Sequence, residues 1–161
     1  MSKIIGITGS KDVGKTYYAS LIIKLLVENG YKIGSIKHAH HDFDIDKPGT
    51  DSFKHREAGA NEVIISSSKR WAKIIENDDK NEKNLEELIK EFHEVDIIVV
   101  EGFKKENHPK IEILGKGLKN KNKEANNVIA FVSDELKDTS TPVFKKNDTK
   151  NLVDFIIKKI L

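Results

Sequence analysis

With 161 residues, the chain is long enough to bury a core, and we expect a single domain over residues 1–161. It is 37% hydrophobic and 34% charged, has a formal net charge of +2 and contains no cysteine. The missing cysteine excludes disulfides and thiolate metal sites, and the near balance of charge gives no argument for nucleic acid. No apolar run approaches the roughly 20 residues that span a bilayer, and the N-terminal apolar stretch is too short for a signal peptide. We therefore expect a cytoplasmic protein that binds neither nucleic acid nor membranes.

The first part of the chain predicts a βαβ unit. Lys3–Thr8 is a short β-branched strand ended by Gly9. Lys15–Asn29 is a helix with one apolar side and Gly30 as its stop. Tyr31–Lys37 follows as a second strand, and this order implies that the two strands are parallel.

After a polar loop, the middle of the chain predicts a small insertion. Thr50–Ala58 forms a short helix with Thr50 as its N-cap. Glu62–Ser66 and Trp71–Ile75 are two strands of a hairpin, and the charged segment Glu76–Lys83 is a solvated loop. Such a hairpin would add a small antiparallel sheet to the domain.

The second half of the chain returns to helices and buried strands. Asn84–Glu94 is an amphipathic helix, and Ile97–Val100 is a β-branched run typical of a central parallel strand. A basic, Asn-rich loop covers residues 115–127. Three further strands and a closing helix are predicted at Lys110–Leu114, Val128–Val132, Pro142–Phe144 and Thr149–Leu161. The sequence thus predicts an α/β fold with a mostly parallel sheet and a small antiparallel insertion.

Eight residues between the first strand and the first helix match the phosphate-loop pattern G-x-x-x-x-G-K-[ST]. They are Gly9, Ser10, Lys11, Asp12, Val13, Gly14, Lys15 and Thr16. Glycines let the backbone approach an anion closely, and the N–H groups at the helix start face the β-phosphate. Lys15 is placed to span the β- and γ-phosphates as a catalytic residue, Thr16 to bind Mg²⁺, and Tyr17 to adjoin the nucleotide. The match predicts a three-layer, P-loop NTPase-like fold that binds a nucleoside triphosphate with Mg²⁺.

A second candidate is Glu101, which ends the predicted strand 97–100. Ligands of open α/β sheets bind at this end of the strands. An acid in this place commonly supports Mg²⁺ or a water bound to it, so we assign Glu101 a metal-binding and catalytic role. The alternative is a glutamate that only caps a neighbouring helix.

The segment 37–52 contains three histidines and four aspartates. One interpretation is a metal site, because histidine and carboxylate are good ligands, although the spacing matches no known pattern. We prefer a switch-like loop facing the γ-phosphate, in which Lys37 contacts phosphate and Asp51 holds Mg²⁺ or its waters. A solvated loop without ligand is the third interpretation. We expect ordinary surface positions for the isolated His55, His93 and His108. Arg56 and Arg70 are candidate anion contacts, but for each we prefer an ordinary surface or salt-bridge role.

The identity of the base depends on Asp134, which follows the predicted strand 128–132. An aspartate there could accept hydrogen bonds from guanine N1–H and N2–H₂. The full Asn-Lys-x-Asp string is absent, and a turn or helix-cap role for Asp134 stays open. The residues alone do not decide between GTP and ATP.

Taken together, these segments resemble the molybdopterin-guanine dinucleotide biosynthesis protein B (MobB) family. Beyond the phosphate loop, the matching stretches are 36–52, 58–60, 68–72, 100–104 and 109–112. The resemblance implies a homodimeric GTP-binding protein with weak Mg²⁺-dependent GTPase activity in molybdenum or tungsten cofactor biosynthesis. It implies as partner a MobA-type nucleotidyltransferase, which attaches GMP to molybdopterin, and it leaves molybdopterin as a candidate ligand.

The chain also departs from that family. Tyr17 stands where a threonine is usual, Asp12 replaces a small residue, and Gly115 stands where we expect an arginine. The order of Lys37, Asp51 and Glu101 is also similar to dethiobiotin synthetase, whose acids help to bind Mg²⁺. An ATP-dependent kinase or ligase of that type is therefore an alternative function, and a non-hydrolysing nucleotide switch is another.

Overall fold

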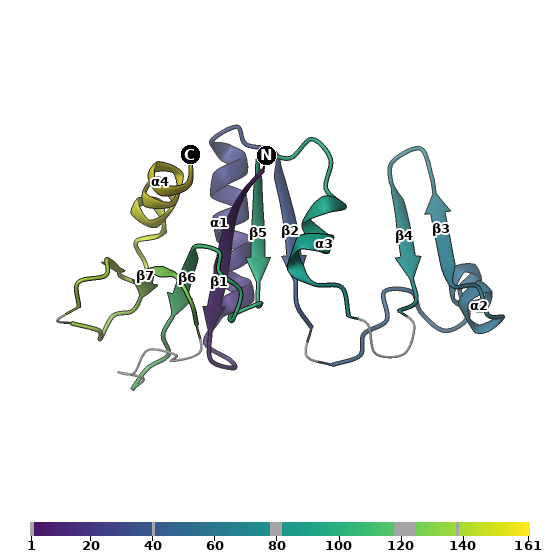
Figure 1. Ribbon diagram of the computed structural model, residues 1–161, viewed down its shortest axis with the longest axis horizontal. Coiled ribbons are helices and arrows are strands. Elements are labelled where there is room, and N and C mark those ends of the chain that lie inside the picture. Colours follow the sequence, from purple (N-terminus) through teal and green to yellow (C-terminus); the bar gives the residue numbers. More distant parts are fainter. Residues whose placement is uncertain (1, 40, 78–81, 118–124, 138) are drawn as a thin grey trace. The chain divides into compact units, whose positions relative to one another are not determined.

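The computed structural model describes residues 2–39, 41–77, 82–117, 125–137 and 139–161 (Figure 1). The chain divides into two compact units. We call Met1–His38 together with Leu85–Leu161 the sheet unit, and Ala39–Asn84 the hairpin unit. The expectation of one domain over residues 1–161 stays a prediction. No helix among the described residues is long and apolar enough to cross a membrane.

The sheet unit is built on six strands in the order β2-β5-β1-β6-β7-β8. Each neighbouring pair is parallel, which confirms the predicted sheet. The strands are β1 (Lys3–Gly9), β2 (Ile33–Lys37), β5 (Ile97–Glu101), β6 (Lys110–Ile113), β7 (Val128–Val132) and β8 (Val143–Phe144). β1 and β5 are central because their β-branched residues can be buried on both faces.

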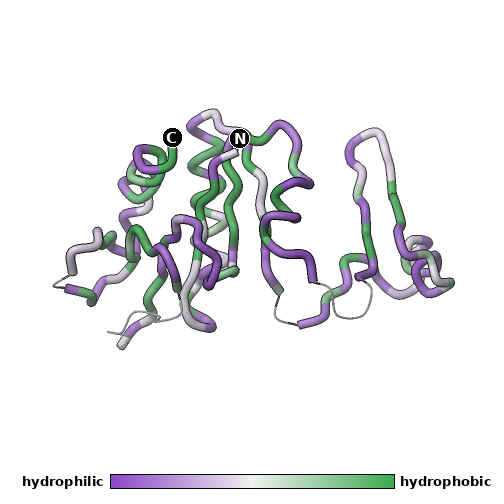
Figure 2. Tube along the Cα trace, viewed as in Figure 1, coloured by the Kyte–Doolittle hydropathy of each residue, from purple (hydrophilic) through white to green (hydrophobic). Residues whose placement is uncertain are grey.

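Helices cover both faces of this sheet and give three layers. The helices α1 (Lys15–Glu28) and α4 (Thr149–Ile160) pack on alternate residues of β1, such as Ile5 and Ile7. The short helix α3 (Leu85–Lys90) contributes to a second apolar cluster with Ile36, Ile98 and Val100. Figure 2 shows the hydrophobic residues following the central strands and α1. The sheet therefore has its larger core under α1 and α4.

Helix α3 is shorter than the predicted segment Asn84–Glu94, because it ends at Lys90. The N–H groups of the next two residues donate to carbonyls three residues back instead of four. Glu94 then adopts a left-handed backbone angle, with φ of 55°. The helical spacing of apolar residues continues past Lys90, because Phe92 still packs against the second apolar cluster. The spacing alone therefore predicted a helix that is too long.

The other face of β6 is polar and buried. Lys110 is fully buried, and its ammonium donates to the backbone oxygens of Glu106, His108 and Asn126, the latter two at 3.0 Å. These bonds hold two loops onto the sheet. Burial lowers the pKa of Lys110 to about 8.

His108 lies beside Lys110 and is only 6% exposed. Gly6 makes room for it, since a Cβ atom on Gly6 would lie 2.5 Å from His108 Nε2. Burial, and then the charge of Lys110, lower the pKa of His108 to about 4. The expectation of a surface histidine is wrong here, because the chain after β5 folds back over the sheet.

The hairpin unit contains α2 (Asp51–Glu57) and an antiparallel pair, β3 (Glu62–Ser66) and β4 (Trp71–Ile75). Both strands have the predicted bounds, and Thr50 occupies the N-cap position as expected, although its side chain does not cap the helix. Val63 is the one buried apolar residue among the described residues of this unit. Large apolar side chains remain exposed on Phe43, Ile45, Ile64, Ile65 and Trp71.

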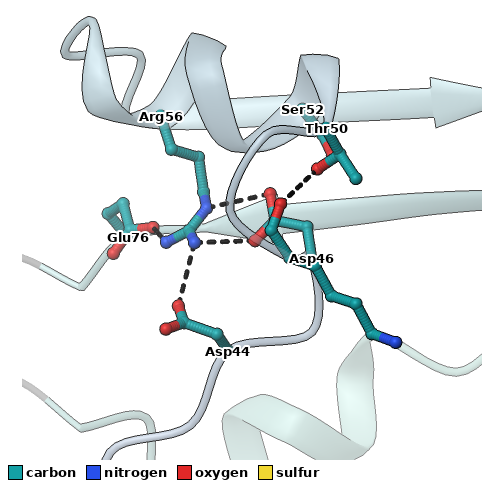
Figure 3. Close-up of polar contacts among 7 residues, drawn as sticks. Asp44, Asp46, Thr50, Ser52, Arg56 and Glu76 are labelled. Carbon is teal, nitrogen blue, oxygen red and sulfur yellow. Dashed lines mark hydrogen bonds and ion pairs between the residues drawn. The ribbon is translucent and has the colours of Figure 1, made fainter.

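Arg56 organises the polar side of the hairpin unit (Figure 3). Its guanidinium lies 2.6 Å from Asp46, 2.9 Å from Asp44 and 2.6 Å from Glu76. These bonds raise the pKa of Arg56, and the bond to Arg56 holds the pKa of Asp46 below its ordinary value. The salt-bridge role expected for Arg56 is confirmed, and it joins the polar loop, α2 and the end of β4.

Candidate functional site

The phosphate loop connects the carboxyl end of β1 to the first turn of α1. Gly9 and Gly14 have φ angles of 149° and 92°, which favour glycine. A Cβ atom on Gly9 would lie 2.5 Å from the carbonyl oxygen of Ile113, so β6 also requires glycine at this position. Asp12 is exposed, as an acid within a phosphate-binding loop must be.

The N-terminus of α1 has the properties of an anion site. No side chain within the described residues caps it, and its first turn contains no acid. Its N–H groups and the positive end of the helix dipole therefore face the loop. Lys15 Nζ donates to the backbone oxygen of Ser10 at 2.6 Å, which holds the ammonium over the loop.

Three predicted site residues meet at the edge of the sheet next to this loop. The Thr16 hydroxyl donates to Glu101 Oε1 at 2.7 Å. Lys37 Nζ lies 3.3 Å from Thr16 Oγ1 and 3.5 Å from Glu101 Oε1. The register explains the meeting, since Glu101 pairs with Lys37 on one side and with Ile7 of β1 on the other.

This cluster has the chemistry for a phosphate-bound metal. The Glu101 side chain is only 13% exposed, so its charge is partly shielded from water. A carboxylate and a hydroxyl are hard oxygen ligands that suit Mg²⁺, and a lysine beside them suits phosphate oxygens. The residues present therefore fit a Mg²⁺–triphosphate ligand.

Asp51 belongs to the hairpin unit, where its side chain is 92% exposed and lies 3.4 Å from Lys54 Nζ. Its role as a metal residue stays a prediction.

Two other predicted residues lie on the same unit as the phosphate loop. Asp134 is exposed, and its Oδ1 accepts the backbone N–H of Lys146 at 3.0 Å. Tyr17 is also exposed, and its ring contacts the ring of Tyr18 edge-on at 5.4 Å. Their contacts to a nucleotide stay predictions.

The loop rich in histidine and aspartate shows a structural use for two of its acids, because Asp44 and Asp46 bind Arg56. Within the described residues, no three His, Asp or Glu side chains are grouped to hold a metal ion. His40 lies outside the described residues. The switch-like role of the loop stays a prediction.

A stacked pair that the sequence did not predict lies beside the cluster. The rings of His38 and Phe103 are 4.4 Å apart and nearly parallel, at 20°. The N–H of His38 donates to the carbonyl oxygen of Glu101 at 2.8 Å. Gly102 permits this approach, since a Cβ atom there would lie 2.7 Å from His38 Cβ. The sequence feature that could have indicated this pair is Gly102-Phe103 directly after Glu101. It can be interpreted only when β2 is known to pair with β5.

A parallel sheet, a phosphate loop after its first strand and an acid at the end of the adjacent strand define a P-loop protein. The comparison with protein families agrees. Residues 4–134 match the family model for molybdopterin guanine dinucleotide synthesis protein B, MobB. The chain belongs to this family.

Individual relatives support the same assignment. The chain is 35% identical over 163 aligned positions to the molybdopterin-guanine dinucleotide biosynthesis adapter protein of Escherichia coli K12, covering 98% of this chain and 93% of the relative. It is 37% identical over 110 positions to the protein of the same name from Haemophilus influenzae, covering 67% and 61%. A crystal structure of molybdopterin-guanine biosynthesis protein B is similar in fold, with a TM-score of 0.79, 24% identity and coverage of 96% and 97%.

Proposed function

We propose that this protein binds Mg²⁺–GTP at the phosphate loop and serves as an adapter in molybdopterin-guanine dinucleotide biosynthesis. In this role it assists a MobA-type nucleotidyltransferase that attaches GMP to molybdopterin, with molybdopterin as a further candidate ligand. The observation that carries the proposal is the cluster of Thr16, Glu101 and Lys37 beside the uncapped start of α1. Membership of the MobB family supports the pathway. We place the protein in the cytoplasm, where GTP is supplied.

The chemistry assigned to the site follows from these side chains. Lys15 and the N–H groups of α1 bind the β- and γ-phosphates. Thr16 would supply its hydroxyl to Mg²⁺ in place of its bond to Glu101, and Glu101 would support the metal or a water bound to it. Lys37, whose ammonium lies beside Thr16 and Glu101, would contact the phosphate oxygens. Bound Mg²⁺ would neutralise phosphate charge, and slow GTP hydrolysis is the expected side activity.

We also propose that the protein is a homodimer. The hairpin unit leaves Ile64 64% and Trp71 69% exposed, and a two-stranded hairpin alone is marginally stable. A second copy that covers these side chains would remove apolar surface from water. Light scattering should give twice the chain mass, and Trp71→Glu should shift it toward one chain mass. A monomeric wild-type protein at micromolar concentration would contradict this part of the proposal.

The test of the adapter role is a reconstituted reaction with a purified MobA-type enzyme, molybdopterin and GTP. Addition of this protein should raise the yield of the guanine dinucleotide. Lys15→Ala should abolish the increase and weaken GTP binding at least about tenfold, because it removes a charge-assisted phosphate contact. Lys24→Ala is the matched control, since Lys24 lies on the same helix with its side chain 70% exposed.

Each result has a distinct meaning. Unchanged GTP affinity in Lys15→Ala would refute the assigned site. Nucleotide binding without any increase in product would refute the adapter role. Release of ADP that depends on a small substrate would instead favour the kinase or ligase alternative.

A further inference from the structure

Two loops of the sheet unit place an acid and an amide donor side by side. Asp134 follows β7 and Lys146 follows β8, and these strands are parallel neighbours. Asp134 Oδ1 accepts the Lys146 backbone N–H at 3.0 Å. The Ser133 N–H donates to the Phe144 carbonyl oxygen at 2.9 Å, which closes the two loops on each other. Both loops leave the carboxyl edge of the sheet, where the phosphate loop also begins.

A buried tyrosine ties this pair to the phosphate-binding helix. Tyr18 is only 5% exposed, and its hydroxyl donates to the backbone oxygen of Lys146 at 3.1 Å. Burial, followed by the nearby charge of Asp134, raises the pKa of the Tyr18 hydroxyl, which therefore stays a hydrogen-bond donor. Tyr18 is the second residue after Thr16, so it links the Asp134–Lys146 pair to the first turn of α1.

The paired groups are the chemical complement of guanine. The guanine edge offers O6 as an acceptor and N1–H and N2–H₂ as donors, while adenine offers a donor at N6 and an acceptor at N1. A carboxylate can accept from N1–H and N2–H₂ while the adjacent N–H donates to O6. Adenine would direct its N1 lone pair at the carboxylate, and an unpaired polar group at such a site is costly.

We propose that Asp134 and the backbone N–H of Lys146 form the guanine-reading edge of this protein, and that Tyr18 is the positioning residue that holds this edge to α1. On guanine binding, Asp134 exchanges the Lys146 N–H for the base donors, and Lys146 donates to O6 instead. The number of hydrogen bonds does not fall in this exchange. The inference rests on the proposed nucleotide site and deepens it by naming the groups that select the base.

The test compares GTP, ATP and xanthosine triphosphate (XTP) by titration calorimetry with Mg²⁺. Wild-type protein should prefer GTP. Asp134→Asn should weaken GTP at least about tenfold and reverse the preference between GTP and XTP, since asparagine can donate to the O2 atom of xanthine. The calorimetry also covers Tyr18→Phe and the control Tyr31→Phe, and thermal unfolding verifies that each variant is folded.

Tyr18→Phe should weaken GTP about fivefold, the effect of one lost hydrogen bond, and leave ATP unchanged. A Tyr18→Phe variant that loses GTP and ATP affinity equally would overturn the positioning role, because a general structural defect would act on both. One result would overturn the base-reading edge while the phosphate site stands: GTP and ATP bind equally, Asp134→Asn alters neither affinity, and Lys15→Ala weakens both. No binding of any triphosphate would overturn the proposed function as well.

Discussion

His108 should make the folded protein sensitive to mild acid. In the folded state its pKa is about 4, against an ordinary value of 6.5, because the imidazole is buried beside Lys110. Between these two values the unfolded chain binds a proton that the folded chain does not. Titration of His108 therefore leaves the free energy of unfolding unchanged above about pH 6.5 and lowers it as the pH falls from 6.5 toward 4. Below pH 4 this residue causes no further loss.

The size of the effect follows from the same two pKa values. Each pH unit within this window is worth about 1.4 kcal/mol. Between about pH 7 and about pH 5, His108 should lower the free energy of unfolding by about 2 kcal/mol. This loss is a substantial fraction of the stability of an ordinary domain.

Urea unfolding at the two pH values measures the effect, and a variant isolates it. His108→Leu replaces the imidazole with an apolar side chain of similar size that cannot titrate. This variant should therefore lose less stability than the wild type on acidification. His93→Leu, at an exposed position, should behave like the wild type. The wild-type loss minus the His108→Leu loss is the contribution of this imidazole. Identical losses in wild type and His108→Leu would refute the reasoning.

Three further predictions concern other parts of the molecule. Gly6→Ala should lower the free energy of unfolding by about 1–3 kcal/mol through overpacking against His108, and an unchanged melting temperature would contradict the close contact. Glu101→Gln should lower Mg²⁺-dependent GTP turnover with little change in melting temperature, and full turnover would make Glu101 a structural residue. Arg56→Ala should speed hydrogen exchange in residues 41–50, because Asp44 and Asp46 lose their partner. The control Arg70→Ala should not, and equal exchange in the two variants would show that Arg56 does not hold the loop.

Local sequence signals predicted most of the elements. The β-branched runs predicted all six strands of the sheet to within two residues at each end, and the hairpin strands with the same bounds. They succeeded because each strand is short, apolar and bounded by glycine, proline or polar residues. The predicted end of α3 was wrong, because Phe92 continues the apolar pattern in a turn that is no longer α-helical.

Burial of polar side chains could not be predicted in this way. His108 and Lys110 look like surface residues in a charged segment, yet a glycine on the neighbouring strand and a loop that folds back bury both. Such burial depends on which strands become neighbours, because only then is the space above Gly6 defined. Nothing within a few residues of His108 carries that information.

The sequence by itself determined the phosphate loop, the parallel sheet and the strand-end acid, because each is encoded in contiguous residues whose backbone preferences are local. Only the tertiary structure decided which side chains share a site. Glu101 meets Thr16 and Lys37 because β5 lies between β1 and β2. Asp134 meets the Lys146 amide because β7 and β8 are neighbours. Strand order is set by packing of the whole chain, and it brings together residues that are far apart in the sequence.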